Sequence, residues 1–90
     1  MDTPDESPLQ FPCDFPIKVM GRDEDDDFRS AAVSIVEAEV GRLSADAVTT
    51  QPSRNGRFLS VTVTVRAESR EQLDSLYRRL SSHERVLVVL

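Results

Sequence analysis

Apolar and polar residues alternate most regularly over residues 59–65, where leucine or valine holds every second position and hydroxyl side chains lie between them. This period of two predicts a strand with one buried face. An Asn-Gly pair shortly before it favours a hairpin turn, so residues 48–52 are expected to form the paired strand. Pro52 cannot donate a ladder hydrogen bond, which predicts an edge strand. A four-residue loop over residues 54–57 would place Pro52 opposite Leu59 without needing that bond.

Residues 14–21 also alternate, with Lys18 and Met20 on the face opposite the apolar side chains, and they predict a second half-buried strand. From Phe28 onward, apolar side chains recur at helical spacing, and Gly41 supplies a stop. These segments predict a strand followed by a helix.

A second helix is predicted to begin at Ser69. Its hydroxyl can cap the backbone while Gln72 reaches back, as in a capping box, and an apolar stripe follows over residues 73–80. The last six residues, 85–90, are apolar except for Arg85 and predict a further strand.

The predicted order is strand, helix, strand, strand, helix, strand. Two βαβ units joined by a hairpin give the ferredoxin-like split βαβ fold, of the α+β class. With the strands numbered along the chain, the antiparallel four-stranded sheet has the order 4-1-3-2, and both helices cover one face. A chain of 90 residues forms one domain, which we expect to span residues 11–90. Residues 1–10 offer little to bury and predict a disordered tail.

Composition argues against several classes of partner. The net charge is −5, and residues 1–45 hold eleven acids against four bases, whereas residues 46–90 hold five acids against seven arginines. Because phosphate neutralisation supplies most non-specific affinity, no nucleic acid is expected as a partner. No run approaches the roughly 20 apolar residues that span a bilayer, and no signal peptide is recognisable, so we expect a cytoplasmic protein with no membrane partner.

Few residues offer chemistry. Cys13 is the only cysteine, and His83, the only histidine, lies among polar residues at the end of the second helix with no partner for general-base work. Five consecutive acids, residues 23–27, suggest either a cation site or an N-cap with negative charge at the start of a helix. The second interpretation is favoured, because consecutive residues cannot all converge on one ion. We therefore expect no enzyme activity, no metal and no cofactor.

Several short segments keep a characteristic order and spacing. They are Phe11-Pro12, residues 17–21, residues 53–61, Glu71-Gln72-Leu73 with Leu76-Tyr77, and Val89-Leu90. Together they resemble the YbeD-like family of small bacterial proteins of unknown function. The resemblance covers residues 11–90. It implies a ferredoxin-like fold similar to the ACT domains that sense small metabolites, and a regulatory role tied to lipoate metabolism. Family members often carry a histidine near the end of the first helix, where this chain has Glu39, so no role for it carries over.

Two binding functions are open for such a chain. In the first, a metabolite-sensing regulatory module binds its ligand at the corner formed by Gly21, Arg22 and Asp23, because glycine permits close approach and helix N-termini suit anions. In the second, a protein-interaction module uses its open sheet face and its edge strands. On that face, Lys18 and Met20 would lie beside Thr62.

The last strand is expected to be apolar on both faces. If Val86, Val88 and Leu90 face the helices, then Leu87 and Val89 point to the outer face. A strand with apolar side chains on both faces is usually covered by protein on both faces, and an edge strand can also pair with a further strand. The cover would be the chain's own segment before the first strand, a second copy in a homodimer formed through the edge strand, or a different protein.

Overall fold

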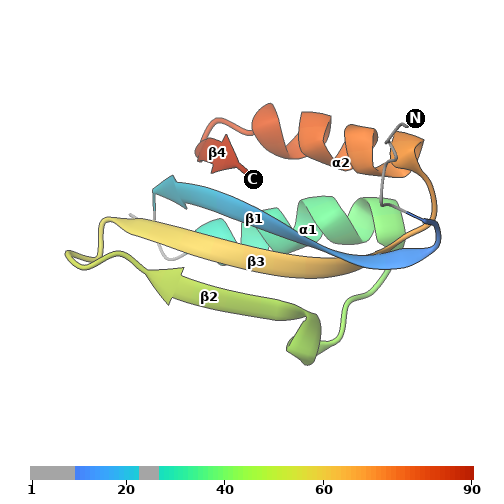
Figure 1. Ribbon diagram of the computed structural model, residues 1–90. Coiled ribbons are helices and arrows are strands. Elements are labelled where there is room, and N and C mark those ends of the chain that lie inside the picture. Colours follow the sequence, from blue (N-terminus) through green and yellow to red (C-terminus); the bar gives the residue numbers. More distant parts are fainter. Residues whose placement is uncertain (1–9, 23–26) are drawn as a thin grey trace, which may run out of the picture.

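An antiparallel sheet carries two helices on one face (Figure 1). The computed structural model describes residues 10–22 and 27–90. In chain order the elements are β1 (Cys13–Arg22), α1 (Phe28–Val40), the short 3₁₀ turn η1 (Ala45–Ala47), β2 (Val48–Pro52), β3 (Phe58–Ala67), α2 (Arg70–Ser81) and β4 (Val86–Val89). The sheet order is β2-β3-β1-β4, which is the predicted order read from the other edge. The ferredoxin-like arrangement is therefore confirmed, and η1 is an element that the sequence pattern did not predict.

Two predictions fall largely outside the described residues. Of the predicted tail, only Gln10 is described, and of the acidic run, only Asp27. The proposed tail and the interpretation of the other four acids stay predictions.

β1 and β3 form the centre of the sheet as two ten-residue strands in continuous register. Ile17 lies opposite Val63, and Val19 lies opposite Val61. All four side chains are fully buried beneath the helices, and the hydroxyl residues between the valines lie on the opposite face. The predicted orientation of both strands is confirmed.

The hairpin between β2 and β3 has the expected loop length. The Ser53 N–H donates to the carbonyl oxygen of Phe58 over 2.8 Å, which encloses the four residues 54–57. In return, the Phe58 N–H donates to Ser53 Oγ at 3.1 Å. Because this ladder bond joins Ser53 to Phe58, the next pair, Pro52 and Leu59, is a non-hydrogen-bonded one. Pro52 therefore sits in an edge strand where its missing N–H leaves no gap in the ladder.

The start of α2 follows the capping pattern. Ser69 Oγ accepts a hydrogen bond from the Gln72 N–H at 3.1 Å, and Gln72 Oε1 accepts one from the Glu68 N–H at 2.8 Å. Ser69 thus caps the helix as predicted, and Gln72 reaches back, but to the N–H of Glu68 rather than to that of Ser69 as in a capping box.

The ends of α1 behave differently from each other. Gly41 ends the helix with a φ of 93°, as predicted for a glycine stop. At the start, the Asp27 side chain makes no capping hydrogen bond. Its Oδ2 atom lies 3.6 Å from Arg85 Nη1 instead, so the carboxylate links α1 to the start of β4. Asp27 is the N-cap residue, and its negative charge lies at the helix start as predicted, but its side chain does not make the capping bond.

The segment before β1 packs against the core at the end of the sheet remote from β4. Phe11 is half-buried and contacts the core cluster, and Cys13 pairs with Ala67 where β1 begins. β4 pairs with the other end of β1, about 20 Å away at the rise of a strand. Leu87 remains half exposed. Of the three covers considered for Leu87, the Phe11-Pro12 segment is therefore not the one that the structure shows.

β4 contains an irregularity in its pairing with β1. Val86 lies opposite Gly21, but Val88 lies opposite the adjacent Met20. Leu87 is therefore an extra residue on the β4 side, a β-bulge. Such a bulge shifts the alternation of every later side chain in the strand by one position.

This shift moves Val89 to the helix side of the sheet. It lies opposite the buried Val19 and packs against the core. Val88 and Leu90 are on the outer face instead, with 42% and 63% of their surface exposed. The prediction that Leu87 faces outward is confirmed. The predictions that Val88 and Leu90 face the helices and that Val89 faces outward are wrong. A strand that is apolar throughout carries no alternation from which the bulge could be detected.

Gly21 lies where the end of β1 meets both α1 and β4. A Cβ atom at this position would overlap the ring of Phe28 and the carbonyl oxygen of Arg85. Packing within the chain therefore requires the glycine. The prediction that Gly21 offers close approach to a ligand is wrong, because the ring and the β4 backbone already occupy that space.

Gly21→Ala is expected to lower the free energy of unfolding by about 1–3 kcal/mol, the usual cost of overpacking a core. Denaturant unfolding measures this loss. If the Phe28 ring is the main obstacle, combining the change with Phe28→Leu should cost less than the sum of the two single changes. Strictly additive losses would show that the two residues do not interact in this way.

Candidate functional site

Two rows of side chains cross the outer face of the sheet. One row runs Thr49, Thr62, Lys18, Leu90, and the other runs Gln51, Ser60, Met20, Val88. The side over β2 and β3 is polar, and we call Thr49, Gln51, Ser60 and Thr62 the polar platform. The side over β4 is apolar, and we call Met20, Leu87, Val88 and Leu90 the apolar patch. A hollow of about 380 Å³ lies over the polar platform and Lys18.

The apolar patch is the most unusual feature of this surface. Within the described part of the chain, the large hydrophobic side chains that are exposed are Leu87, Val88 and Leu90, at 50%, 42% and 63%. All three lie in β4 or directly after it. Single exposed apolar residues are normal on protein surfaces, but a group gathered on one edge strand is typical of a site that contacts a partner.

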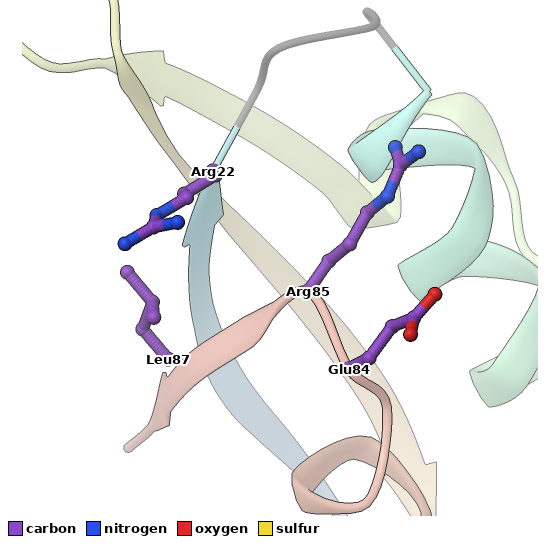
Figure 2. A pocket seen from close by; sticks show the side chains of 4 residues that line it. All are labelled: Arg22, Glu84, Arg85 and Leu87. Carbon is purple, nitrogen blue, oxygen red and sulfur yellow. The ribbon is translucent and has the colours of Figure 1, made fainter.

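Two cations border this patch. Lys18 exchanges two backbone hydrogen bonds with Leu90, at 2.8 and 3.1 Å, so its side chain emerges beside that leucine. Arg22 ends β1, and Figure 2 shows its guanidinium group next to the Leu87 side chain. Within residues 10–22 and 27–90, neither cation forms an ion pair.

The opposite end of the outer face has little net charge. There Asp14 Oδ1 and Arg66 Nη1 lie 3.4 Å apart, and both side chains are largely exposed. An exposed pair of this kind adds little stability, but its charges offset each other. Among the described residues of β1 and β3 that face outward, the cations without a paired carboxylate are therefore Lys18 and Arg22, beside the apolar patch.

A second hollow, of about 320 Å³, lies where β4 begins and is lined by Arg22, Glu84, Arg85 and Leu87 (Figure 2). The two arginines do not converge in it. Figure 2 shows the Arg22 guanidinium beside Leu87, whereas the Arg85 side chain extends toward α1, where Nη1 approaches Asp27. This arrangement does not form a cradle for one small anion.

The backbone of β4 is open on one side. Leu90 exchanges both of its backbone bonds with Lys18 of β1, and β4 is the last strand in the sheet order. Because bonding directions alternate along a strand, the N–H and C=O of Val89 point away from β1, toward the sheet edge. Tyr77 of α2 donates its hydroxyl to the carbonyl oxygen of Leu90 at 3.1 Å and so anchors the end of the strand. Burial raises the pKa of the Tyr77 phenol above its ordinary value.

The helix side of the molecule is tied together by polar contacts. Glu39 Oε1 accepts hydrogen bonds from Ser75 Oγ at 3.2 Å and from Arg79 Nη1 at 2.9 Å. The residue that replaces the expected histidine of the first helix thus joins α1 to α2. A hollow of about 350 Å³ lies between these helices, close to Arg79.

The side chains that could act in catalysis or bind a metal do not form a common site. His83 Nδ1 accepts a hydrogen bond from the Arg85 backbone N–H at 3.2 Å, and this closes the turn between α2 and β4. Cys13 is a partly buried free thiol at the far end of β1. In residues 10–22 and 27–90, His, Cys, Asp and Glu side chains form no group of three or more that could hold a metal ion.

The predicted surface residues divide into two groups. Lys18, Met20, Thr62 and Leu87 share the outer face, as expected, and Arg22 of the predicted ligand corner lies there with them. Gly21 and Val89 lie on the helix side. Asp23, the third residue of the predicted ligand corner, lies outside the described residues.

Sequence reasoning missed two members of the patch. Val88 and Leu90 were assigned to the core, but both are on the outer face. Their apolar character gave no signal, because apolar residues suit either face of this strand.

Comparison with known proteins assigns nearly the whole chain to one family. The family described as "Protein of unknown function (DUF493)" matches residues 6–90. The chain belongs to this family. A UPF0250 protein from Paraburkholderia phytofirmans is 47% identical over 90 residues, which cover all of both chains. A UPF0250 protein from Ralstonia nicotianae is 47% identical over 97% of this chain and 89% of its own.

A distant solved structure has the same fold. The solution structure of protein HP0495 from H. pylori covers 100% of this chain and 97% of its own, with a TM-score of 0.71 and 18% sequence identity. It supports the ferredoxin-like architecture, and at this identity it carries no functional assignment. The family match and the UPF0250 relatives confirm the resemblance to YbeD-like proteins. In the portion of the chain that is described, neither helix has the length and apolar character needed to cross a bilayer.

The bulge predicts opposite effects for two neighbouring substitutions. Leu87→Asp should change the free energy of unfolding by no more than about 0.5 kcal/mol, because the side chain is exposed. Val89→Asp should cost about 2–4 kcal/mol, because it places a carboxylate against the core. Denaturant unfolding of both variants measures the difference. A larger loss for Leu87→Asp than for Val89→Asp would contradict the assigned register.

Proposed function

We propose that this protein is a non-enzymatic regulatory binding protein that acts by docking a partner protein on its apolar patch. The observation that supports this most strongly is the concentration of exposed apolar side chains on one edge strand, Leu87, Val88 and Leu90. Burying such side chains on association is favourable by about 25 cal/mol for each Å² removed from water. A small domain close to the lower limit of stability gains nothing by exposing them unless they contact another molecule.

The surroundings of the patch fit a protein partner better than a small ligand. The patch is a row along a strand, and open backbone groups lie beside it at Val89. A small-molecule site is usually a concave pocket in which a few polar groups converge. The outer face has shallow hollows, and the two arginines of the hollow beside Leu87 extend in different directions.

Metabolite sensing in the manner of ACT domains is the second candidate. The hollow of about 320 Å³ lined by Arg22, Glu84, Arg85 and Leu87 favours it. It includes Arg22, one residue of the corner where a ligand was predicted. A connection to lipoate metabolism rests on the family resemblance alone. A cytoplasmic location belongs to the same proposal and is supported by the acidic composition and the single cysteine.

A comparative capture experiment tests the proposal. The full chain and its Leu87→Asp variant are immobilised in parallel and exposed to a lysate of the source bacterium. We expect a protein that is retained by the unaltered chain and lost with the variant. That protein is then purified, and its dissociation constant is measured for both chains, with an expected loss of about tenfold or more. Thr64→Asp is the matched control, since it adds the same charge at an exposed outer-face position away from the patch.

The outcomes separate the two candidates. Equal binding by both chains would show that the apolar patch is not the docking surface. If no protein depends on Leu87 but one compound from a metabolite panel raises the melting temperature, and Arg22→Ala abolishes that shift, sensing replaces docking as the function.

A further inference from the structure

We propose, building on the docking function above, that the partner contributes an extended acidic and apolar segment, which pairs with β4 as a fifth strand. The apolar side chains of this segment would cover Leu87 and Val88, and its carboxylates would meet Lys18 and Arg22. The backbone, the side chains and the charge of the edge each support this occupant.

The backbone of β4 presents a template for strand addition. β4 lies at the end of the sheet order, and the N–H and C=O of Val89 point away from β1. Proteins commonly protect such edges with charged side chains, proline or a cover. β2, at the other edge, ends with Pro52, whereas β4 is Val-Leu-Val-Val throughout. An extended segment that pairs here would gain main-chain hydrogen bonds, as in other cases of strand addition.

The side chains around β4 determine which face of the added strand is apolar. A fifth strand would lie about 4.8 Å beyond β4. Its outward side chains would then flank Leu87, Val88 and Leu90, all of which are exposed. Apolar side chains at the outward positions of the added strand would bury their own surface and that of the apolar patch against each other.

Charge complementarity makes the partner segment acidic. Lys18 emerges beside Leu90, and the Arg22 guanidinium lies beside Leu87. Both cations therefore stand at the border of the surface that the added strand would cover. A long cationic side chain can reach across one strand while its stem packs on apolar neighbours. Carboxylates on the segment would pair with these cations, and like charges would be rejected.

The same observations disfavour a second copy of this chain. A two-fold pairing of β4 with β4 would bring the same residues of both copies together, so that Lys18 and Arg22 of each would border one short interface. The strand is also only four residues long, which gives a small contact compared with the roughly 1,600 Å² of a standard stable interface. A flexible segment from an acidic partner can add contacts beyond the strand, whereas a rigid copy cannot.

Selection from a peptide library tests the inference with a defined probe. A phage-displayed library of random segments about ten residues long, enough for one strand, is selected on the full chain. We expect the enriched segments to combine aspartate or glutamate with valine, isoleucine, leucine or phenylalanine. A synthetic peptide of the most enriched sequence should bind at least about tenfold more weakly to Leu87→Asp.

Charge reversal provides the readout that a merely structural role would not change. In the double variant Lys18→Glu with Arg22→Glu, selection from the same library should shift from acidic to basic segments, and the acidic peptide should lose about tenfold in affinity. The matched control is Arg54→Glu with Arg57→Glu, which makes the same change in net charge at exposed positions of the hairpin loop. The control should keep the preference of the unaltered chain.

Backbone pairing is measured separately by amide hydrogen exchange. Binding of the enriched peptide should slow exchange at the Val89 N–H, which points to the open edge, and leave the Leu90 N–H, already bonded to Lys18, unchanged. Peptides that bind without protecting Val89, or whose selection is indifferent to charge reversal, would overturn the inference.

The failure of this inference differs from failure of the docking function. If no acidic segment is enriched but a partner still depends on Leu87, the docking function stands and the strand-addition model is wrong. If sedimentation shows a dimer that Leu87→Asp converts to a monomer, the occupant is a second copy and the inference is again wrong. If neither a peptide nor a protein depends on Leu87, both proposals fail.

Discussion

The register of β1 against β3 is the constraint on which the rest of the molecule depends. These two strands are paired over ten positions; every second residue is buried in β3 and is buried or half-buried in β1. A slip of β3 by one residue would move its valines to the outer face and bring hydroxyls beneath the helices, and a slip of β1 would do the same to Ile17 and Val19. Since burial of one such side chain is worth about 1.5–3 kcal/mol, this register is strongly selected over its neighbours. The helices, the edge strands and the composition of the outer face all follow from it.

The bulge at Leu87 has the greatest consequence for function. Gly21 admits the Phe28 ring and the Arg85 carbonyl where β1 ends, and at the same point β4 gains one residue relative to β1. The inserted residue places Val88 and Leu90 on the outer face and uses Val89 to complete the core. The close packing around Gly21 and the exposed row on β4 thus belong to the same corner of the fold.

The two sides of the sheet have different properties. On the helix side, Glu39 joins α1 to α2, and the two helices cover an apolar core. On the outer side, hydroxyl and amide groups over β2 and β3 can remain hydrated at little cost, whereas the apolar row over β4 cannot. The exposed apolar surface is therefore narrow and lies next to Lys18 and Arg22. This asymmetry favours recognition at an edge over recognition across the whole face.

Most of this fold could be predicted from local patterns in the sequence. Alternation in β1 and β3, the Ser69 cap, the Gly41 stop and the position of Pro52 are local signals, and each depends on the chemistry of a few neighbouring residues. The orientation of β4 could not be determined in the same way. Four consecutive apolar residues are compatible with either face, so the pairing of Met20 with Val88 and of Gly21 with Val86 decided which side chains became exposed. The requirement for glycine at position 21 also depends on tertiary contacts, because the Phe28 ring and the Arg85 carbonyl oxygen that leave no room for a Cβ atom belong to other elements. Local patterns specify elements, whereas an exposed binding surface depends on how those elements meet.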